Sequence, residues 1–245
     1  MTITTPVASN KNLTPFFEEP EKSTTQAVQI ILMRHGKSDH NGIDGNFWYN
    51  SNPNHPNYKV SNLTEIGKNQ VQESSEELLA MGIRPFNAIA YVSPLPRTQQ
   101  TVAILFQNRV VGEWKTDEIL IEAQAGDLEG QFGNKDANGV PYTKEANKNA
   151  KINANYESRE SIELRANKFA ISLLSDLKCL STENRLPKHV IVISHDETLH
   201  YLTKALCLDE ASKAMIETGK FRVYTLLTSV LGSLSSESIE VFDEI

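Results

Sequence analysis

VQIILMRHGKSDHN, residues 28–41, opens with six mostly apolar residues and closes with polar ones. A short apolar run that ends close to a glycine is typical of a buried β-strand. Here the run stops at Arg34 and His35, which are bulky and polar, and Gly36 then frees the backbone. The stretch therefore predicts a buried strand that presents a cation and an imidazole at its carboxyl end.

The rest of the chain alternates segments that predict strands with segments that predict helices. Further strands are predicted at residues 86–94, 116–122, 189–194, 223–230 and 238–245. Helices are predicted at residues 63–82, 95–107, 158–177 and 197–207. This alternation predicts an α/β fold, a three-layer αβα sandwich with a mostly parallel central sheet.

The 245 residues are enough for one sizeable domain and rather few for two. Residues 1–26 are rich in Thr, Ser, Asn, Pro and Glu, which predicts a disordered or loosely docked extension. Residues 27–245 then form a single domain. Polar stretches near 42–62 and 126–156 predict loop or cap insertions in it.

Composition and charge exclude some classes of partner. With 39% hydrophobic and 22% charged residues the chain resembles ordinary globular proteins, and its net charge of −7 argues against a nucleic-acid-binding surface. No apolar run reaches the roughly 18 residues of a membrane span, so no membrane partner is expected. The first residues lack a secretory pattern, which predicts a cytoplasmic location. The oligomeric state is not predicted.

Four predicted strands end in, or lead into, a polar group. The first ends in Arg34 and His35, the second leads to Arg97, the third ends in Glu122 and the fourth is followed by His195. In parallel sheets ligands bind outside the carboxyl ends of the strands, so these groups are expected to meet on one edge. The sequence therefore predicts a site of two guanidiniums, two imidazoles and one carboxylate.

This set of side chains suits phosphoryl transfer. Guanidinium is permanently charged and binds phosphate in bidentate fashion. A histidine can attack phosphorus and form a covalent intermediate, and a carboxylic acid can protonate the leaving oxygen. Because fixed cations neutralise the phosphoryl charge, neither a metal ion nor another cofactor is expected.

Six motifs carry a family resemblance. They are RHGKSDHN at 34–41, LTEIGKNQ at 63–70, SPLPRTQQT at 93–101, IEAQAGDLEG at 121–130, ESIELR at 160–165 and VIVISH at 190–195. In this order they resemble the motifs of the histidine phosphatase superfamily, also called the phosphoglycerate mutase-like family. The resemblance implies a phosphoglycerate mutase-like fold and a small phosphomonoester as substrate.

The resemblance also implies roles for individual residues. His35 would be the phosphorylated nucleophile, Arg34 and Arg97 would bind the phosphoryl group, and His195 would complete the cage around it. Glu122 would be the proton donor.

Asn41 would contact phosphate or substrate, and Ser38 would support the turn on which Asn41 lies. Asp196, which follows the second histidine, is an alternative acid, although a helix start and nearby cations are expected to lower its pKa.

Several interpretations stay open. Glu160 and Arg165 either belong to a family motif or have no role in the site. In the second case Glu160 only complements the dipole at the helix N-terminus, and Arg165 is only an exposed charge on the helix. The aromatic residues of the 42–62 loop fold over the site or form a peripheral lobe. His40, His55 and His200 are expected to be loop or surface residues.

The leading hypothesis is a metal-independent phosphomonoester hydrolase. A phosphoglycerate-type mutase is the alternative with the same chemistry, since residues 131–151 contain four lysines. A non-catalytic protein that binds phosphorylated ligands is the third.

Overall fold

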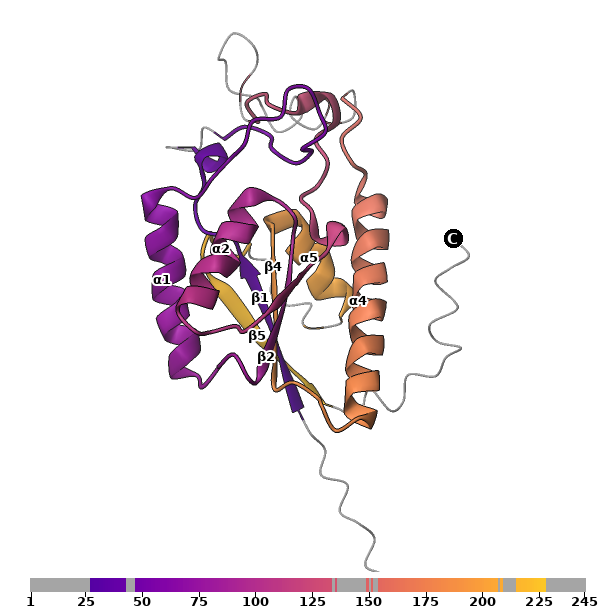
Figure 1. Cartoon of the computed structure of the whole chain (residues 1–245). Helices are drawn as coiled ribbons and strands as arrows, with labels where there is room; N and C mark the ends of the chain where they lie inside the picture. The colour runs from indigo at the N-terminus through magenta and orange to yellow at the C-terminus, as the bar shows by residue number, and fades with distance from the viewer. Residues whose placement is uncertain are drawn as a thin grey trace, which may run out of the picture.

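The computed structural model describes residues 27–42, 47–133, 135, 149, 151, 154–206, 208 and 215–227 (Figure 1). The predicted extension at 1–26 and the predicted last strand at 238–245 lie outside these residues. None of the described helices is both long and apolar enough to cross a membrane.

A five-stranded sheet forms the centre of the molecule. Its strands are β1 (Ala27–Arg34), β2 (Ala88–Val92), β3 (Trp114–Thr116), β4 (His189–Ser194) and β5 (Phe221–Leu227). Their order is β3-β2-β4-β1-β5, and only β5 runs antiparallel to its neighbour. The parallel strands therefore end on one edge, as their sequence pattern predicts.

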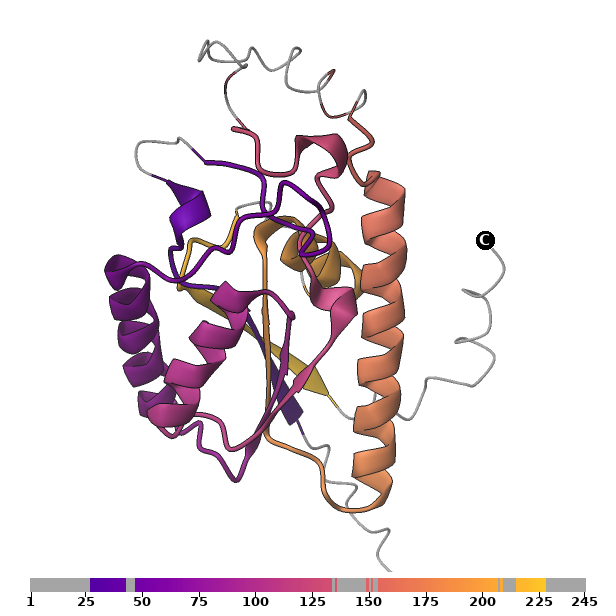
Figure 2. The same ribbon diagram turned by 45° about the horizontal axis from the view of Figure 1, so that its top comes forward.

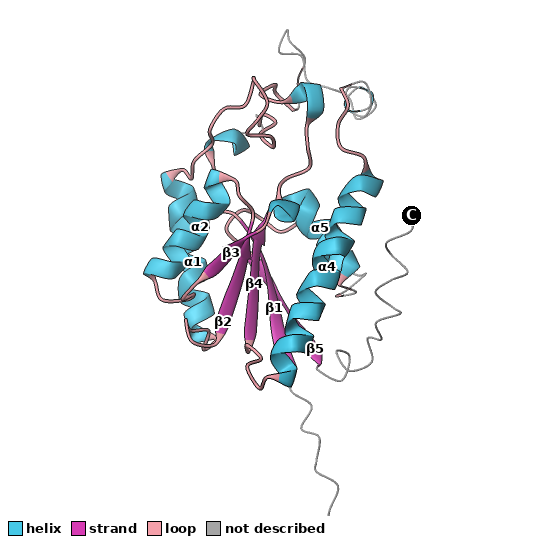
Figure 3. Cartoon of the chain, turned by 45° about the vertical axis from the view of Figure 1, so that its right-hand side comes forward, coloured by secondary structure: helices cyan, strands magenta, loops and turns pink. Residues whose placement is uncertain are grey.

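Helices cover both faces of this sheet. They are α1 (Glu65–Ala80), α2 (Pro96–Gln107), α4 (Arg159–Thr182) and α5 (Asp196–Ala205). Figure 3 shows α1 and α2 on one side of the strands and α4 and α5 on the other. The prediction of a three-layer α/β fold with a mostly parallel sheet is thus confirmed.

Alternation along the strands divides the core into two parts. In β1, Ile30 and Leu32 face α4 and α5, where they belong to the same buried cluster as Phe169. Ile31 and Met33 belong to the cluster on the opposite face, with α1 and α2. Because successive strand residues point to opposite faces, a central strand apolar at every position is buried on both sides.

Gly36 is required for space. A Cβ at Gly36 would lie 2.4 Å from the carbonyl oxygen of Gly67, and one at Gly67 would lie 1.9 Å from that of Lys37. The two glycines let the start of α1 pack directly against the end of β1. The sequence suggested a backbone conformation as the reason for Gly36, whereas the structure shows a close approach of two backbones.

The predicted strand at 116–122 is wrong over most of its length. β3 ends at Thr116, and the next residues form the 3₁₀ helix η2 (Glu118–Leu120), which Asp117 caps by accepting from the backbone N–H of Ile119. The carbonyl groups that follow accept from side chains instead of from a neighbouring strand. Ser194 Oγ donates to the carbonyl of Leu120 at 2.7 Å.

The described residues of the two stretches predicted as insertions lie next to each other above the carboxyl ends of the strands (Figure 2). The backbone N–H of Tyr49 donates to Gln131 at 2.9 Å, and Gly130 donates back to Tyr49 at 3.0 Å. Trp48 and Phe132 form an isolated antiparallel bridge. This pairing places the described part of the first loop over the edge where the site is expected.

Candidate active site

The carboxyl ends of β1 and β4 bring the two predicted histidines together. Arg34 pairs with Ser194 in the sheet, and the backbone N–H of His35 donates to the carbonyl of Ser194 at 3.2 Å. The ring centroids of His35 and His195 are 5.1 Å apart, and both side chains are buried. Two segments separated by about 160 residues of chain thus meet at one point.

The hydrogen bonds of His35 fix its tautomer. Its Nδ1 lies 2.8 Å from the carbonyl oxygen of Gly36, which can only accept, so Nδ1 carries the hydrogen. Its Nε2 accepts from Nε of Arg97 at 3.2 Å. Burial, then Arg97, lowers the pKa of His35 well below its usual value. The ring is therefore neutral, with a lone pair on Nε2.

Arg97 is completely buried beside that lone pair. Its Nη1 donates to Oδ1 of Asn50 at 2.7 Å and its Nη2 donates to the backbone carbonyl of Asn50 at 2.9 Å. Burial lowers the pKa of Arg97 to about 10, so the group is still a cation at neutral pH. Sequence reasoning missed Asn50, because its contact with Arg97 joins residues that are 47 positions apart.

His195 occupies the N-cap position of α5 without a capping bond from its side chain, and it contacts Ser93, which follows β2. Ser93 Oγ lies 2.8 Å from Nε2 of His195 and accepts from the backbone N–H of Leu95 at 3.4 Å. With Ser93 donating to Nε2, the hydrogen of the neutral ring lies on Nδ1. Nδ1 is buried and has no hydrogen-bond partner within the described residues. It faces Glu122, 3.9 Å from its Oε2.

Glu122 has the environment of a proton donor. Its side chain is 21% exposed, and its Oε1 accepts from the backbone N–H of Ala123 at 2.9 Å. Burial raises the pKa of Glu122 to about 7, with Arg97 opposing the rise and Glu197 adding to it. At neutral pH a large fraction of this carboxyl group is therefore protonated.

The pKa of Asp196 differs from the value that the sequence led us to expect. Burial raises its pKa, although Arg34 opposes the rise, whereas the sequence led us to expect a lowered pKa. The desolvation of the carboxylate outweighs the helix start and the cation. Asp196 Oδ1 lies 3.6 Å from Nη1 of Arg34, which also donates to the carbonyl of Ile216 at 3.0 Å.

Ser38, His40 and Asn41 form a closed network. Ser38 Oγ donates to Oδ1 of Asn41 at 3.0 Å and lies 2.8 Å from Nδ1 of His40, and Asn41 Nδ2 lies 3.2 Å from Nε2 of His40. Ser38 thus supports the turn that presents the amide of Asn41. The expectation of a surface histidine is wrong for His40, which is 8% exposed and whose ring centroid lies 5.6 Å from that of His35. His55 is half-buried and His200 is exposed.

Arg165 holds the backbone that carries Glu122. Its Nη1 donates to the carbonyls of Ile119 and Ile121 at 2.6 and 2.8 Å, and its Nε donates to Glu157 at 2.9 Å. Arg165 is therefore not an exposed helix charge. Glu160 is exposed, so the acidic partner of Arg165 is Glu157, three residues earlier than the motif suggested.

A second buried carboxylate fixes the first loop. Glu129 is completely buried and accepts from the N–H and hydroxyl of Ser51 and from the N–H of Asn52. Ser51 Oγ in turn accepts from the backbone N–H of Ala125 at 2.8 Å. These bonds join the residue next to Asn50 to the segment that follows Glu122.

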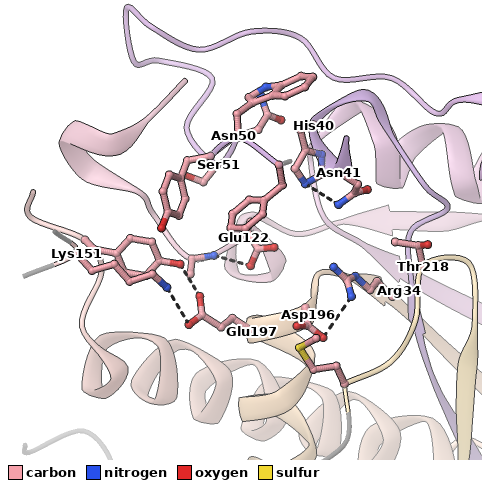
Figure 4. Close-up of a pocket in the computed structure, with 16 residues that line it drawn as sticks. Arg34, His40, Asn41, Asn50, Ser51, Glu122, Lys151, Asp196, Glu197 and Thr218 are labelled. Carbon is pink, nitrogen blue, oxygen red and sulfur yellow. Dashed lines mark hydrogen bonds and ion pairs between the residues drawn. The ribbon is translucent and has the colours of Figure 1, made fainter. Parts of the chain in front are cut away.

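A cavity of about 570 Å³ opens beside the buried histidines. Figure 4 shows Glu122 between Asn50 and Ser51 of the loop on one side and Asp196 and Glu197 of α5 on the other. Its lining residues are Arg34, His40, Asn41, Phe47, Trp48, Tyr49, Asn50, Ser51, Glu122, Ala123, Lys151, Tyr156, Asp196, Glu197, Met215 and Thr218. His35, Arg97 and His195 are buried and are not among the residues that line the cavity.

The loop aromatics do not all contribute to the cavity. Phe47, Trp48 and Tyr49 line it, whereas Tyr58 lies beside Glu129 in a separate depression. Of the lysines that suggested a mutase, Lys151 lines the cavity and Lys135 packs on the ring of Phe132. Lys144 and Lys148 lie outside the described residues. No group of three metal-ligating side chains is found among the residues that the structure describes.

Comparison with protein families gives one match. The model of the histidine phosphatase superfamily, branch 1, matches residues 30–227, which include every predicted site residue. No curated protein matches the sequence of the chain.

Solved structures with the same fold are distant in sequence. A mycobacterial glucosyl-3-phosphoglycerate phosphatase is 19% identical with a TM-score of 0.56, over 82% of this chain and 91% of the other. The α-ribazole phosphatase from Shigella flexneri is 19% identical with a TM-score of 0.56, over 82% and 94%. The phosphoglycerate mutase from Bacillus anthracis is 18% identical with a TM-score of 0.58, over 82% and 89%. At these identities the likeness concerns the fold.

Proposed function

Because the chain belongs to the histidine phosphatase superfamily, we propose that it is a metal-independent phosphomonoester hydrolase that acts through phosphorylated His35. The observation that carries the proposal is the state of His35. Its Nδ1 is tied to a carbonyl, and its Nε2 lone pair lies beside the buried cation of Arg97. A neutral histidine with a directed lone pair beside a cation is suited to attack a phosphoryl group.

In the first step Nε2 of His35 forms a bond to phosphorus while the ester P–O bond breaks. The guanidiniums of Arg97 and Arg34 and the N–H of His195 stabilise the charge on the phosphoryl oxygens. One hydrogen of the Asn41 amide stays available for the same group. Protonated Glu122 gives its proton to the leaving oxygen, so the product departs as a neutral alcohol.

In the second step water attacks phosphorus and the P–N bond breaks. The Glu122 carboxylate takes a proton from the water, and the electron pair returns to Nε2 of His35. Phosphate leaves and the site is restored without any other reactant. Asp196 is paired with Arg34 in this scheme and does not transfer the proton.

The test uses the purified protein with EDTA on a panel of phosphomonoesters, beside His35→Ala. We expect phosphate release by the wild type alone and a phosphohistidine that can be trapped with ³²P-labelled ester. A large loss of activity with EDTA, restored by Mg²⁺ or Zn²⁺, would contradict the mechanism. Conversion of 3- to 2-phosphoglycerate would favour the mutase, and binding of the esters without turnover would favour a binding protein. The cytoplasmic location stays a prediction.

A further inference from the structure

Four aromatic side chains line the cavity outside the phosphoryl cage and form its aromatic wall: Phe47, Trp48, Tyr49 and Tyr156. Tyr49 stands edge-on to Phe47 and to Tyr156, with ring centroids 5.7 and 5.8 Å apart. Trp48 lies between Phe47 and Tyr49 in the chain and also lines the cavity, and its ring stands edge-on to His40 with the ring centroids 6.5 Å apart. Aromatic lining favours a flat apolar group on the ligand, because such a group removes apolar surface from water on both sides.

The charges in the same cavity disfavour a second anion. Lys151 Nζ lies 3.9 Å from Glu197 and 4.0 Å from the ring centroid of Tyr156, so the one lysine among the described lining residues already has partners. Arg34 is paired with Asp196. A substrate carboxylate outside the cage would lie among Asp196, Glu197 and the ionised fraction of Glu122, and would have to displace Glu197 from Lys151.

One donor in the aromatic wall is unused. The indole Nε1 of Trp48 is buried and has no hydrogen-bond partner in the described part of the chain. A buried N–H without an acceptor is unfavourable, and a neutral oxygen or nitrogen on a ligand would satisfy it.

We propose that the substrate is a phosphomonoester of an aromatic alcohol whose polar atoms are uncharged, and not a phosphoglycerate or a bisphosphate. The inference rests on the proposed function, since it assigns the leaving group of that reaction. The phosphoryl group binds at His35, and the aromatic part of the substrate lies against Trp48 and the rings of Phe47, Tyr49 and Tyr156.

Four alkyl phosphates separate size from charge. They are 2-(4-carbamoylphenyl)ethyl phosphate, its isosteric 4-carboxy analogue, ethyl phosphate and 3-phosphoglycerate. All have alkyl leaving groups that need a proton, so differences in kcat/KM report the recognition of the body of the substrate. We expect the kcat/KM of the carbamoyl ester to exceed that of each of the other three by at least about tenfold.

Two variants and one control variant locate the preference. Trp48→Ala should lower the kcat/KM of the carbamoyl ester to near that of ethyl phosphate. Trp114→Ala, a matched change at an exposed tryptophan away from the cavity, should keep the wild-type ratio of these two kcat/KM values. Glu197→Gln should narrow the gap between the carbamoyl and carboxy esters. Both esters are compared within the same variant, so any effect of the Glu197→Gln change on the protonation of Glu122 cancels in the ratio of their kcat/KM values.

Calorimetric binding of the four esters to His35→Ala gives a readout that does not depend on turnover. If no ester is hydrolysed by the wild type but the binding order is the expected one, the hydrolase proposal fails and the assignment of the ligand stands. If hydrolysis occurs but the kcat/KM of the carboxy ester or of 3-phosphoglycerate equals or exceeds that of the carbamoyl ester, the ligand assignment is overturned and the hydrolase proposal stands.

Discussion

Replacing Glu122 by glutamine keeps the shape of the side chain and removes the proton that it can transfer. The matched change, Asp196→Asn, does the same to Asp196, the alternative acid that lines the same cavity. Glu122 lies 3.9 Å from His195, whereas Asp196 is paired with Arg34 at 3.6 Å. We therefore expect only Glu122→Gln to impair esters whose leaving oxygen needs a proton.

The size of the effect follows from the pKa of Glu122. General acid catalysis contributes roughly 10²–10⁴-fold, so the kcat of Glu122→Gln on ethyl phosphate should fall by about that factor. With a pKa of about 7, roughly half of the Glu122 side chains are protonated at pH 7, about nine tenths at pH 6 and about one tenth at pH 8. Activity that needs the acid is therefore fully present below pH 6 and is lost as the pH rises through 7.

The assay compares ethyl phosphate with p-nitrophenyl phosphate, whose leaving group hardly needs a proton. Above pH 7 the phosphate groups of both substrates are mostly dianionic, so their own ionisation changes the ratio of the two kcat/KM values little between pH 7 and pH 8. In the wild type this ratio should fall by about fivefold between pH 7 and pH 8, following the protonated fraction of an acid with a pKa of about 7. In Glu122→Gln the ratio should be low and independent of pH.

The reasoning is refuted if Asp196→Asn shows the leaving-group and pH dependence and Glu122→Gln does not. The proton would then come from Asp196, whose pKa burial also raises.

Three further changes test the contacts around the cage. Arg97→Met should weaken competitive inhibition by inorganic phosphate by about 30-fold or more, because losing one partner of a desolvated charge pair costs about 2–5 kcal/mol; an unchanged inhibition constant would place Arg97 outside the cage. Arg165→Met should lower the free energy of unfolding in urea by about 3–5 kcal/mol, since its ion pair is mostly buried. Arg185→Met, which removes an exposed ion pair, should cost less than about 1 kcal/mol, and equal losses would contradict the role of Arg165. Glu129→Gln should lower the free energy of unfolding by about 1–3 kcal/mol, because an amide nitrogen cannot accept from Ser51, and an unchanged urea midpoint would be evidence against it.

Strand ends could be predicted because their signal is local. The apolar runs that become β1 and β4 are buried on both faces, and each is followed at once by its polar group. Parallel pairing then places Arg34 beside Ser194 without any further information. For these residues, pattern and topology together determine where the histidines meet.

The apolar run Ile119, Leu120 and Ile121 reads as a strand for the same reason, yet it is not one. Its backbone carbonyls accept from Ser194, Thr198 and Arg165, which come from other elements. An apolar side chain such as that of Leu120 can be buried from a strand or from a 3₁₀ helix, so burial does not distinguish the two arrangements. Only the distant donors decide between them, and the local sequence does not reveal those donors.

Asn50 and His40 were not predicted as site residues because their roles depend on long-range packing. Asn50 reaches Arg97 only because the loop pairs with residues 130–133 and Glu129 binds Ser51. The backbone N–H of His40 donates to Oγ of Ser61, 21 residues later, at 3.0 Å, and Nδ1 of His40 lies 3.2 Å from the same oxygen. An asparagine or histidine in a polar loop gives no local sign of such contacts.

The positions of Glu122 and His195 are linked through α5. His195 occupies the N-cap position of α5, and Thr198, three residues later, donates to the carbonyl of Ile121 at 2.7 Å, directly before Glu122. Arg165 of α4 binds that same carbonyl and the hydroxyl of Thr198. The backbone directly before Glu122 is therefore bound both by α5, which follows His195, and by α4. This coupling explains how an acid on an irregular segment can hold a fixed position beside a histidine that follows a strand.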